Sequence, residues 1–121
     1  MTLVYLIVGG AVGTVMRYGV SKLMIRFFGS HFPLGTFCVN LLGCFLIGVF
    51  MSMFPLKLQA YENYRFLFVI GFCGAFTTFS TFIYEIFVLY KSHNVVGAIT
   101  YLSLSLLGGL AALIIGLTLS K

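Results

Sequence analysis

Charged residues are scarce in this chain of 121 residues. Seven lysines and arginines and two acidic residues make up 7% of it, whereas a soluble domain carries about 25%. Because 61% of the residues are hydrophobic, a soluble surface is excluded. The formal net charge is +5, but the basic residues are spread over loops and the ends of apolar segments, with no basic run that would favour nucleic acid. They are better suited to anchoring at a membrane interface.

Residues that commonly bind metals or catalyse reactions are also few. His31 and His93 are isolated between apolar segments, and Cys38, Cys44 and Cys73 lie inside such segments. A metal site would need closer cysteine pairs or histidine partners, so the cysteines are interpreted as packing residues. The sequence contains no nucleophile–base pair, phosphate-binding loop or ATP motif. We therefore expect no enzyme activity and no catalytic residue.

Four apolar segments are long enough to cross a bilayer, which takes about 20 helical residues each. The predicted spans are residues 3–28, 34–54, 66–90 and 95–119. Pro33 and Pro55 stand at span edges, where a missing N–H does no harm. The short connections leave no room for a soluble domain, and the first three residues lack the basic group of a cleaved signal peptide. We predict a single all-α integral membrane domain over residues 1–121, with both termini on one side.

The basic residues are almost evenly divided between the two ends of these spans. Three lie on the side of the N-terminus and three on the other, with Arg17 a debatable fourth. The two sets are Lys57, Arg65 and Lys121, and Lys22, Arg26 and Lys91. Because orientation follows an excess of Lys and Arg on one face, such a balance favours insertion in both directions. We therefore predict an antiparallel, dual-topology homodimer. The alternative is a protein oriented by a partner or by weaker signals.

The third span contains the most informative stretch, Gly71–Phe82. It places two glycines, four hydroxyl residues and four phenylalanines in the middle of an apolar segment. Lipid offers no hydrogen bonds, so irregular backbone at that depth survives only where it faces protein or a watery cavity. Glycine and consecutive Thr and Ser favour departures from a regular helix. The pattern predicts a break in this helix, with an ion or substrate site beside it.

Two charged residues also lie within the predicted spans. Glu85 is costly in a membrane unless it lines water or finds a partner, and the alternative is that it snorkels toward the interface near Lys91. Arg17 has the same alternative, because a long basic side chain can reach the headgroups from within a turn of a helix end.

Uncharged polar and aromatic groups add a second pattern. Asn40 either lines a pore or bonds to a neighbouring helix, and Tyr101 and Ser105 share one helix face. Phe79 and Phe82 are three apart, so we expect both rings to project from nearly one side of the helix. Ring edges carry positive potential, so a small anion can approach them and accept hydrogen bonds from the neighbouring polar groups. The alternative is that both phenylalanines only pack.

Three motifs together resemble the Fluc (CrcB-type) fluoride channels of microorganisms. They are Gly9–Tyr18 (GGAVGTVMRY), Gly35–Gly43 (GTFCVNLLG) and Gly71–Phe82 (GFCGAFTTFSTF). The motifs occur in the order and in the spans that the family shows. The resemblance covers essentially the whole chain, and its most diagnostic part is Thr-Thr-Phe-Ser-Thr-Phe. It implies an antiparallel homodimer with two separate fluoride pores. It also implies a structural Na⁺ where the two broken helices meet, held by the backbone carbonyls of Gly74 and Thr77.

The resemblance further implies roles for individual side chains. Phe79 and Phe82 correspond to the phenylalanines whose edges face fluoride, and Asn40 to the pore-lining amide. The complete anion path implied by the resemblance is Asn40, Phe79, Ser80, Thr81, Phe82, Glu85, Tyr101 and Ser105. Arg17 corresponds to an arginine that is structural or lines a vestibule. Gly109 stands where some relatives carry a further hydroxyl.

The resemblance therefore implies a channel in the cell membrane, the inner membrane of a microorganism, that passively exports fluoride and lowers its cytoplasmic concentration. The first alternative is a small four-helix drug/proton antiporter of dual topology. Such antiporters depend on a carboxylate in the first helix, where this chain has only Arg17. A second alternative is a small assembly factor of a larger membrane complex, which needs no polar track.

Overall fold

A computed structural model describes residues 1–120, and Lys121 of the charge count lies outside this range. Four helical stretches are long and apolar enough to cross a membrane. In chain order they are α1 (Thr2–Phe28), α2 (Leu34–Met53), the interrupted stretch Gln59–Lys91 and α6 (Val95–Leu119). Within residues 1–120 every element is helical. The predicted all-α membrane fold is confirmed.

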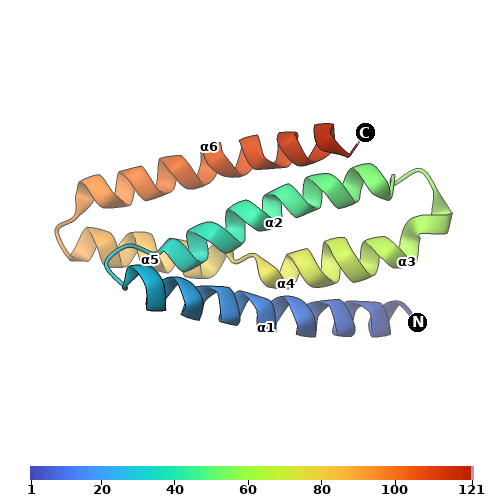
Figure 1. Cartoon of the computed structure of the whole chain (residues 1–121), viewed down its shortest axis with the longest axis horizontal. Coiled ribbons are helices and arrows are strands. Elements are labelled where there is room, and N and C mark those ends of the chain that lie inside the picture. Colours follow the sequence, from blue (N-terminus) through green and yellow to red (C-terminus); the bar gives the residue numbers. More distant parts are fainter. Residues whose placement is uncertain (121) are drawn as a thin grey trace.

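The four stretches run alternately up and down the bundle (Figure 1). Both termini therefore lie at one end, together with the connection between α2 and the third stretch. The α1–α2 and α5–α6 connections lie at the opposite end. Packing is closest between α2 and α6 and between α1 and the first half of the third stretch.

The third stretch is divided into several elements. It begins earlier than residue 66, the start of the predicted span. The Arg65 guanidinium donates to the carbonyls of Pro55 and Leu58, which ties the connection after α2 to the start of this stretch. The elements are η1 (Gln59–Tyr61, 3₁₀), α3 (Glu62–Tyr64), η2 (Arg65–Cys73, π-helical), α4 (Gly74–Phe76) and α5 (Phe79–Lys91). The predicted break lies between α4 and α5, at Thr77 and Thr78.

Glycines allow two of these helices to touch through their backbones. A Cβ atom at Gly116 of α6 would collide with the Phe45 carbonyl oxygen of α2. A Cβ atom at Gly48 of α2 would collide in the same way with the Leu113 carbonyl oxygen of α6. Small residues at such crossings commonly allow helices to pack closely in lipid, where burial of apolar surface contributes little to helix association. This packing fixes α2, which carries the residues that contact the helix break.

Candidate functional site: a helix break and a half-buried carboxylate

The break consists of two residues with extended backbone. Thr77 has ψ near 160°, and Thr78 has φ of −150° and ψ of 122°. The Thr77 hydroxyl donates to the Cys73 carbonyl (2.9 Å), and the Thr78 hydroxyl accepts from the N–H of Thr81 (3.4 Å) as the N-cap of α5. Hydroxyl side chains thus bond to backbone groups on both sides of the interruption, as the sequence pattern predicts. The Cys73 carbonyl also keeps its helical donor, the Thr77 N–H (3.0 Å).

Asn40 of α2 holds the centre of this break. Its Nδ2 donates to the Thr78 carbonyl (3.0 Å), and its Oδ1 accepts from the Thr78 N–H (2.8 Å). In extended backbone the N–H and C=O of one residue point to the same side, so a single side-chain amide can satisfy both. One Nδ2 hydrogen of Asn40 is not used in this pair and can still serve as a donor.

The break leaves the carbonyls of Gly74 and Thr77 without their ordinary helical donors. In a continuous helix the Thr78 N–H would bond to Gly74 and the Thr81 N–H to Thr77. Here the first donates to Asn40 and the second to the Thr78 hydroxyl. Within residues 1–120 no group of three His, Cys, Asp or Glu side chains lies together. A cation at the break would therefore be held by backbone oxygens, and Gly74 and Thr77 fit that requirement.

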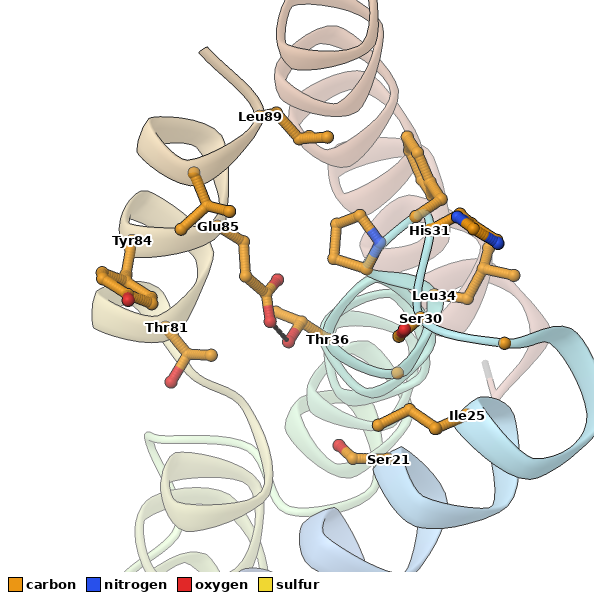
Figure 2. Close-up of a pocket in the computed structure, with 15 residues that line it drawn as sticks. Ser21, Ile25, Ser30, His31, Leu34, Thr36, Thr81, Tyr84, Glu85 and Leu89 are labelled. Atoms are coloured by element: carbon orange, nitrogen blue, oxygen red, sulfur yellow. Dashed lines mark hydrogen bonds between the residues drawn. The ribbon is translucent and has the colours of Figure 1, made fainter. Parts of the chain in front are cut away.

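Glu85 lies in the second turn of α5 and accepts two hydrogen bonds. The Thr36 hydroxyl of α2 donates to Oε1 (2.7 Å) and the Tyr101 hydroxyl of α6 donates to Oε2 (2.7 Å). Figure 2 shows the carboxylate reaching across from α5 toward Thr36. The Lys91 ammonium instead lies over the ring of Phe87, 5.7 Å from its centroid. The alternative that Glu85 snorkels toward Lys91 is therefore wrong, because both of its oxygens are bonded inside the bundle.

Aromatic rings surround the Tyr101 end of this network. Tyr101 is completely buried, and Phe82, only 4% exposed, meets its ring edge to face at 5.1 Å and 81°. Phe79 is 72% exposed, although its centroid is only 6.2 Å from that of Phe82. The two rings are neighbours, but one faces the bundle interior and the other faces out.

A cavity of about 380 Å³ opens beside the carboxylate at the end of the bundle that carries the α1–α2 connection. Thr81, Tyr84 and Glu85 of α5 line one side of it, and Ser21 and Thr36 lie on the other. Thr36 and Glu85 thus form part of the wall of a partly polar opening, whereas Tyr101, which bonds to Glu85, is buried and does not line it.

Known proteins resemble this chain along nearly its whole length. Residues 4–117 match the family described as CrcB-like protein, Camphor Resistance (CrcB). The chain belongs to the CrcB family. A relative from Azobacteroides pseudotrichonymphae named "Fluoride-specific ion channel FluC" is 41% identical, with 94% of this chain and 91% of that protein aligned. A protein of the same name from Chloroflexus aurantiacus is 44% identical over 93% of this chain and 90% of its own length.

Membership of the CrcB family and four spanning helices identify a multi-pass protein of the cell membrane. Within this family member, the remaining predicted site residues are more scattered. Ser80 and Thr81 of α5 are exposed, Thr81 beside the cavity, and Arg17 is half-buried near the middle of α1. The Ser105 hydroxyl oxygen is buried and has no hydrogen-bond partner within residues 1–120. A buried hydroxyl without a partner is costly, so it is a donor available to a ligand.

Two residues that contact the site were not predicted from the sequence as site residues. Thr36 donates to Glu85 and Thr78 pairs with Asn40. Thr36 lies four positions before Asn40, on the same face of α2, and this spacing was the available signal. Thr78 contributes its backbone, so its side-chain type gave no indication of that role.

Proposed function

We propose that this protein is a fluoride-selective channel that passively exports fluoride and so lowers its cytoplasmic concentration. The observation that carries the proposal is a transmembrane helix interrupted beside uncharged donors and aromatic edges, in a chain about 40% identical to proteins named fluoride-specific ion channels. Such a site suits conduction because binding must be strong enough for entry and weak enough for exit.

Fluoride holds its water tightly, so a selective path must replace hydration with well-placed donors. The partnerless Ser105 hydroxyl and the free amide hydrogen of Asn40 supply two. The edges of Phe79 and Phe82 supply positive potential without a fixed cation that would trap the ion. Donors spaced for a small anion leave chloride poorly coordinated, which provides selectivity.

Glu85 stands at the side of the proposed path. Its two oxygens accept from Thr36 and Tyr101, so its charge is stabilised and its position is fixed. Thr81, exposed beside the cavity, and Ser80 on the same helix extend the hydroxyl groups toward the opening. In this arrangement the cavity is the entrance, and the hydroxyls guide the anion past the carboxylate.

The proposed path needs a second copy of the chain. Phe79 belongs to the proposed pore yet is 72% exposed in one chain, so another surface must cover it. An antiparallel partner related by a two-fold axis in the membrane plane would do so and would give two pores. The balanced distribution of lysine and arginine supports insertion in both orientations.

A Na⁺ ion at the centre of this dimer fits the same break. The carbonyls of Gly74 and Thr77 lack their helical donors, and hard cations prefer such oxygens. Two chains would contribute equivalent oxygens, and the bound ion would supply the positive charge that holds the two breaks together. Arg17 lies in α1, as do the glycines that face the third stretch. In this proposal Arg17 either supports the structure or lines a vestibule of the pore.

Proton-coupled drug export and enzyme activity are less well supported. No acidic residue occurs in α1, where the antiporters of similar size carry their essential carboxylate. Glu85, in α5, already accepts two hydroxyl bonds. The family relatives named above are channels, which transport ions and catalyse no reaction.

Fluoride efflux from liposomes tests the proposal directly. Purified protein is reconstituted into vesicles loaded with potassium fluoride, and release is followed with a fluoride electrode after valinomycin is added. We expect rapid fluoride release, no matching chloride release and no requirement for a proton gradient. Release no faster than from protein-free vesicles, or release that depends on a proton gradient, would contradict a channel.

A further inference from the structure

Tyr101 is held by three aromatic rings, and one of them does not belong to a helix. Phe82 of α5 and Phe37 of α2 contact it with centroid separations of 5.1 and 6.5 Å. The third ring is Phe32, at 5.3 Å and 69°, an edge-to-face pair. Phe32 lies in the connection between α1 and α2, directly before Pro33, which precedes the first residue of α2. The α1–α2 connection thus contacts the aromatic group whose hydroxyl donates to Glu85.

Phe32 contacts Tyr101 and also lines the cavity. It lines the opening of about 380 Å³ together with Thr36 and Glu85, whereas Tyr101 is completely buried and does not line it. The Phe32 ring therefore joins the buried Tyr101 ring to the lining of the opening. Because aromatic pairs prefer a defined edge-to-face angle, this contact restricts the tilt of the Tyr101 ring.

We propose that Phe32 is a positioning residue for conduction: its ring fixes Tyr101 so that the Tyr101 hydroxyl stays on Glu85. The inference rests on the proposed channel function and adds a residue from the α1–α2 connection to it. The Tyr101 oxygen stands at the far end of a rigid ring, so a small tilt moves it out of hydrogen-bond range of Oε2, now 2.7 Å away. Water from the cavity would then compete for the hydroxyl.

Loss of this contact would change the carboxylate beside the path. Glu85 would keep only the Thr36 hydroxyl as a donor, and its charge would be free to swing into the opening. A mobile negative charge at the entrance repels the permeating anion. The expected consequence is slower fluoride flux in a protein that remains folded and assembled.

The test compares Phe32→Leu with Phe32→Tyr and with Phe27→Leu. Leu keeps apolar bulk but removes the ring edge, Tyr keeps the ring, and Phe27 is a control on α1 that is 69% exposed. We expect Phe32→Leu to slow fluoride efflux about two- to tenfold, the range that the loss of one edge-to-face contact supports. Phe32→Tyr and Phe27→Leu should conduct like the parent. Parental efflux from Phe32→Leu overturns the inference.

A double variant separates positioning from general packing. If Phe32 acts through the Tyr101 hydroxyl, Phe32→Leu should cause little further slowing in a Tyr101→Phe background. Slowing by the same factor in both backgrounds would overturn the inference. A structure of Phe32→Leu gives a readout that does not depend on flux. A Tyr101 hydroxyl displaced from Glu85 supports the proposal, and one still within hydrogen-bond distance refutes it. If the parent itself releases no fluoride, the channel function fails, and this structure still decides the role of Phe32.

Discussion

The side-chain amide of Asn40 satisfies both backbone polar groups of Thr78, with Nδ2 donating to the carbonyl at 3.0 Å and Oδ1 accepting from the N–H at 2.8 Å. Backbone groups inside a bilayer cannot turn to water, so a helix break there requires a partner of this kind. Gly43, three residues on, allows the same helix to approach the break, because a Cβ atom at Gly43 would collide with the Thr77 methyl group. Together, the hydrogen bonds of Asn40 and the missing side chain of Gly43 allow α2 to pack against the interruption.

Replacing Asn40 should therefore affect both stability and flux. Asn40→Ala leaves the Thr78 N–H and C=O unsatisfied, and we expect a loss of about 1–3 kcal/mol in the free energy of unfolding. Asn40→Asp keeps the shape but removes the Nδ2 donor and adds negative charge beside the path, so fluoride efflux should be nearly abolished. Thermal unfolding in detergent and liposome efflux measure the two effects. Asn63→Ala, at an exposed position, is the matched control. Parental flux from Asn40→Asp would show that Asn40 lies away from the path.

The aromatic pair beside the break gives a prediction with two parts. Phe79→Ile and Phe82→Ile both keep apolar bulk and remove a ring edge, so both should sharply reduce fluoride efflux without preventing dimer formation. Their stabilities should differ. Phe82 packs edge to face on Tyr101, so its replacement should cost about 1 kcal/mol. Phe79 is 72% exposed in one chain, so its replacement should cost less.

Phe27→Ile is the control for both variants, because that ring is 69% exposed on α1. Thr78 is unsuitable as a control because it forms the break itself. If both Phe variants conduct like the parent, the rings serve packing and the anion passes elsewhere.

Thr36→Val tests the hydroxyl that binds Glu85. The variant has nearly the same shape, but it removes a donor at 2.7 Å from a carboxylate inside the bundle. Hydrogen bonds to charged groups contribute about 1.5–3 kcal/mol, so unfolding should become easier by that amount. Efflux should slow as well, because Glu85 then depends on Tyr101 alone. Thr118→Val is the control, since that hydroxyl bonds only to the Ile115 carbonyl of its own helix. Equal stabilities of the two variants would argue against the network.

Dual topology is tested by adding charge at one end. Three lysines placed after Met1 should bias every chain toward one orientation and so reduce efflux from the variant alone. Co-expression with a copy biased the opposite way, by lysines in the α5–α6 connection at the other end of the bundle, should restore it. Labelling of a cysteine at the N-terminus from each side of the membrane reports the orientation. Labelling from one face alone in fully active parent protein would contradict an antiparallel dimer.

Local chemistry made the spans and the break predictable. Apolar runs of sufficient length fix four membrane crossings, and clustered glycine and hydroxyl residues in Gly71–Phe82 favour an interruption wherever the neighbouring helices can satisfy it. The partners of Glu85 were not predictable from α5 alone. They come from α2 and α6, and only tertiary packing brings the Thr36 and Tyr101 hydroxyls to its two oxygens.

The exposed fractions of Phe79 and Phe82 were also not predictable from the sequence pattern. Phe79 and Phe82 are three residues apart and were expected to project from nearly one side of the helix, yet one is 72% and the other 4% exposed. The packing of α6 against α5 decides this difference, because Tyr101 takes up the Phe82 ring and leaves Phe79 outside. Periodicity places residues on a helix face but cannot say which part of that face a neighbour covers.

Sodium dependence is the final prediction, and it follows from the carbonyls of Gly74 and Thr77. Both lack their helical donors because Asn40 and the Thr78 hydroxyl have taken the N–H groups. Protein purified in N-methylglucamine should therefore unfold at a lower temperature than protein purified in Na⁺, and added Na⁺ should restore the midpoint. K⁺ should restore it less well if the two breaks form a small rigid cage. Because backbone oxygens are the ligands, Thr77→Ser should keep the response to Na⁺. Identical midpoints in Na⁺ and N-methylglucamine, together with no electron density on the two-fold axis of a crystallised dimer, would remove the ion from the proposal.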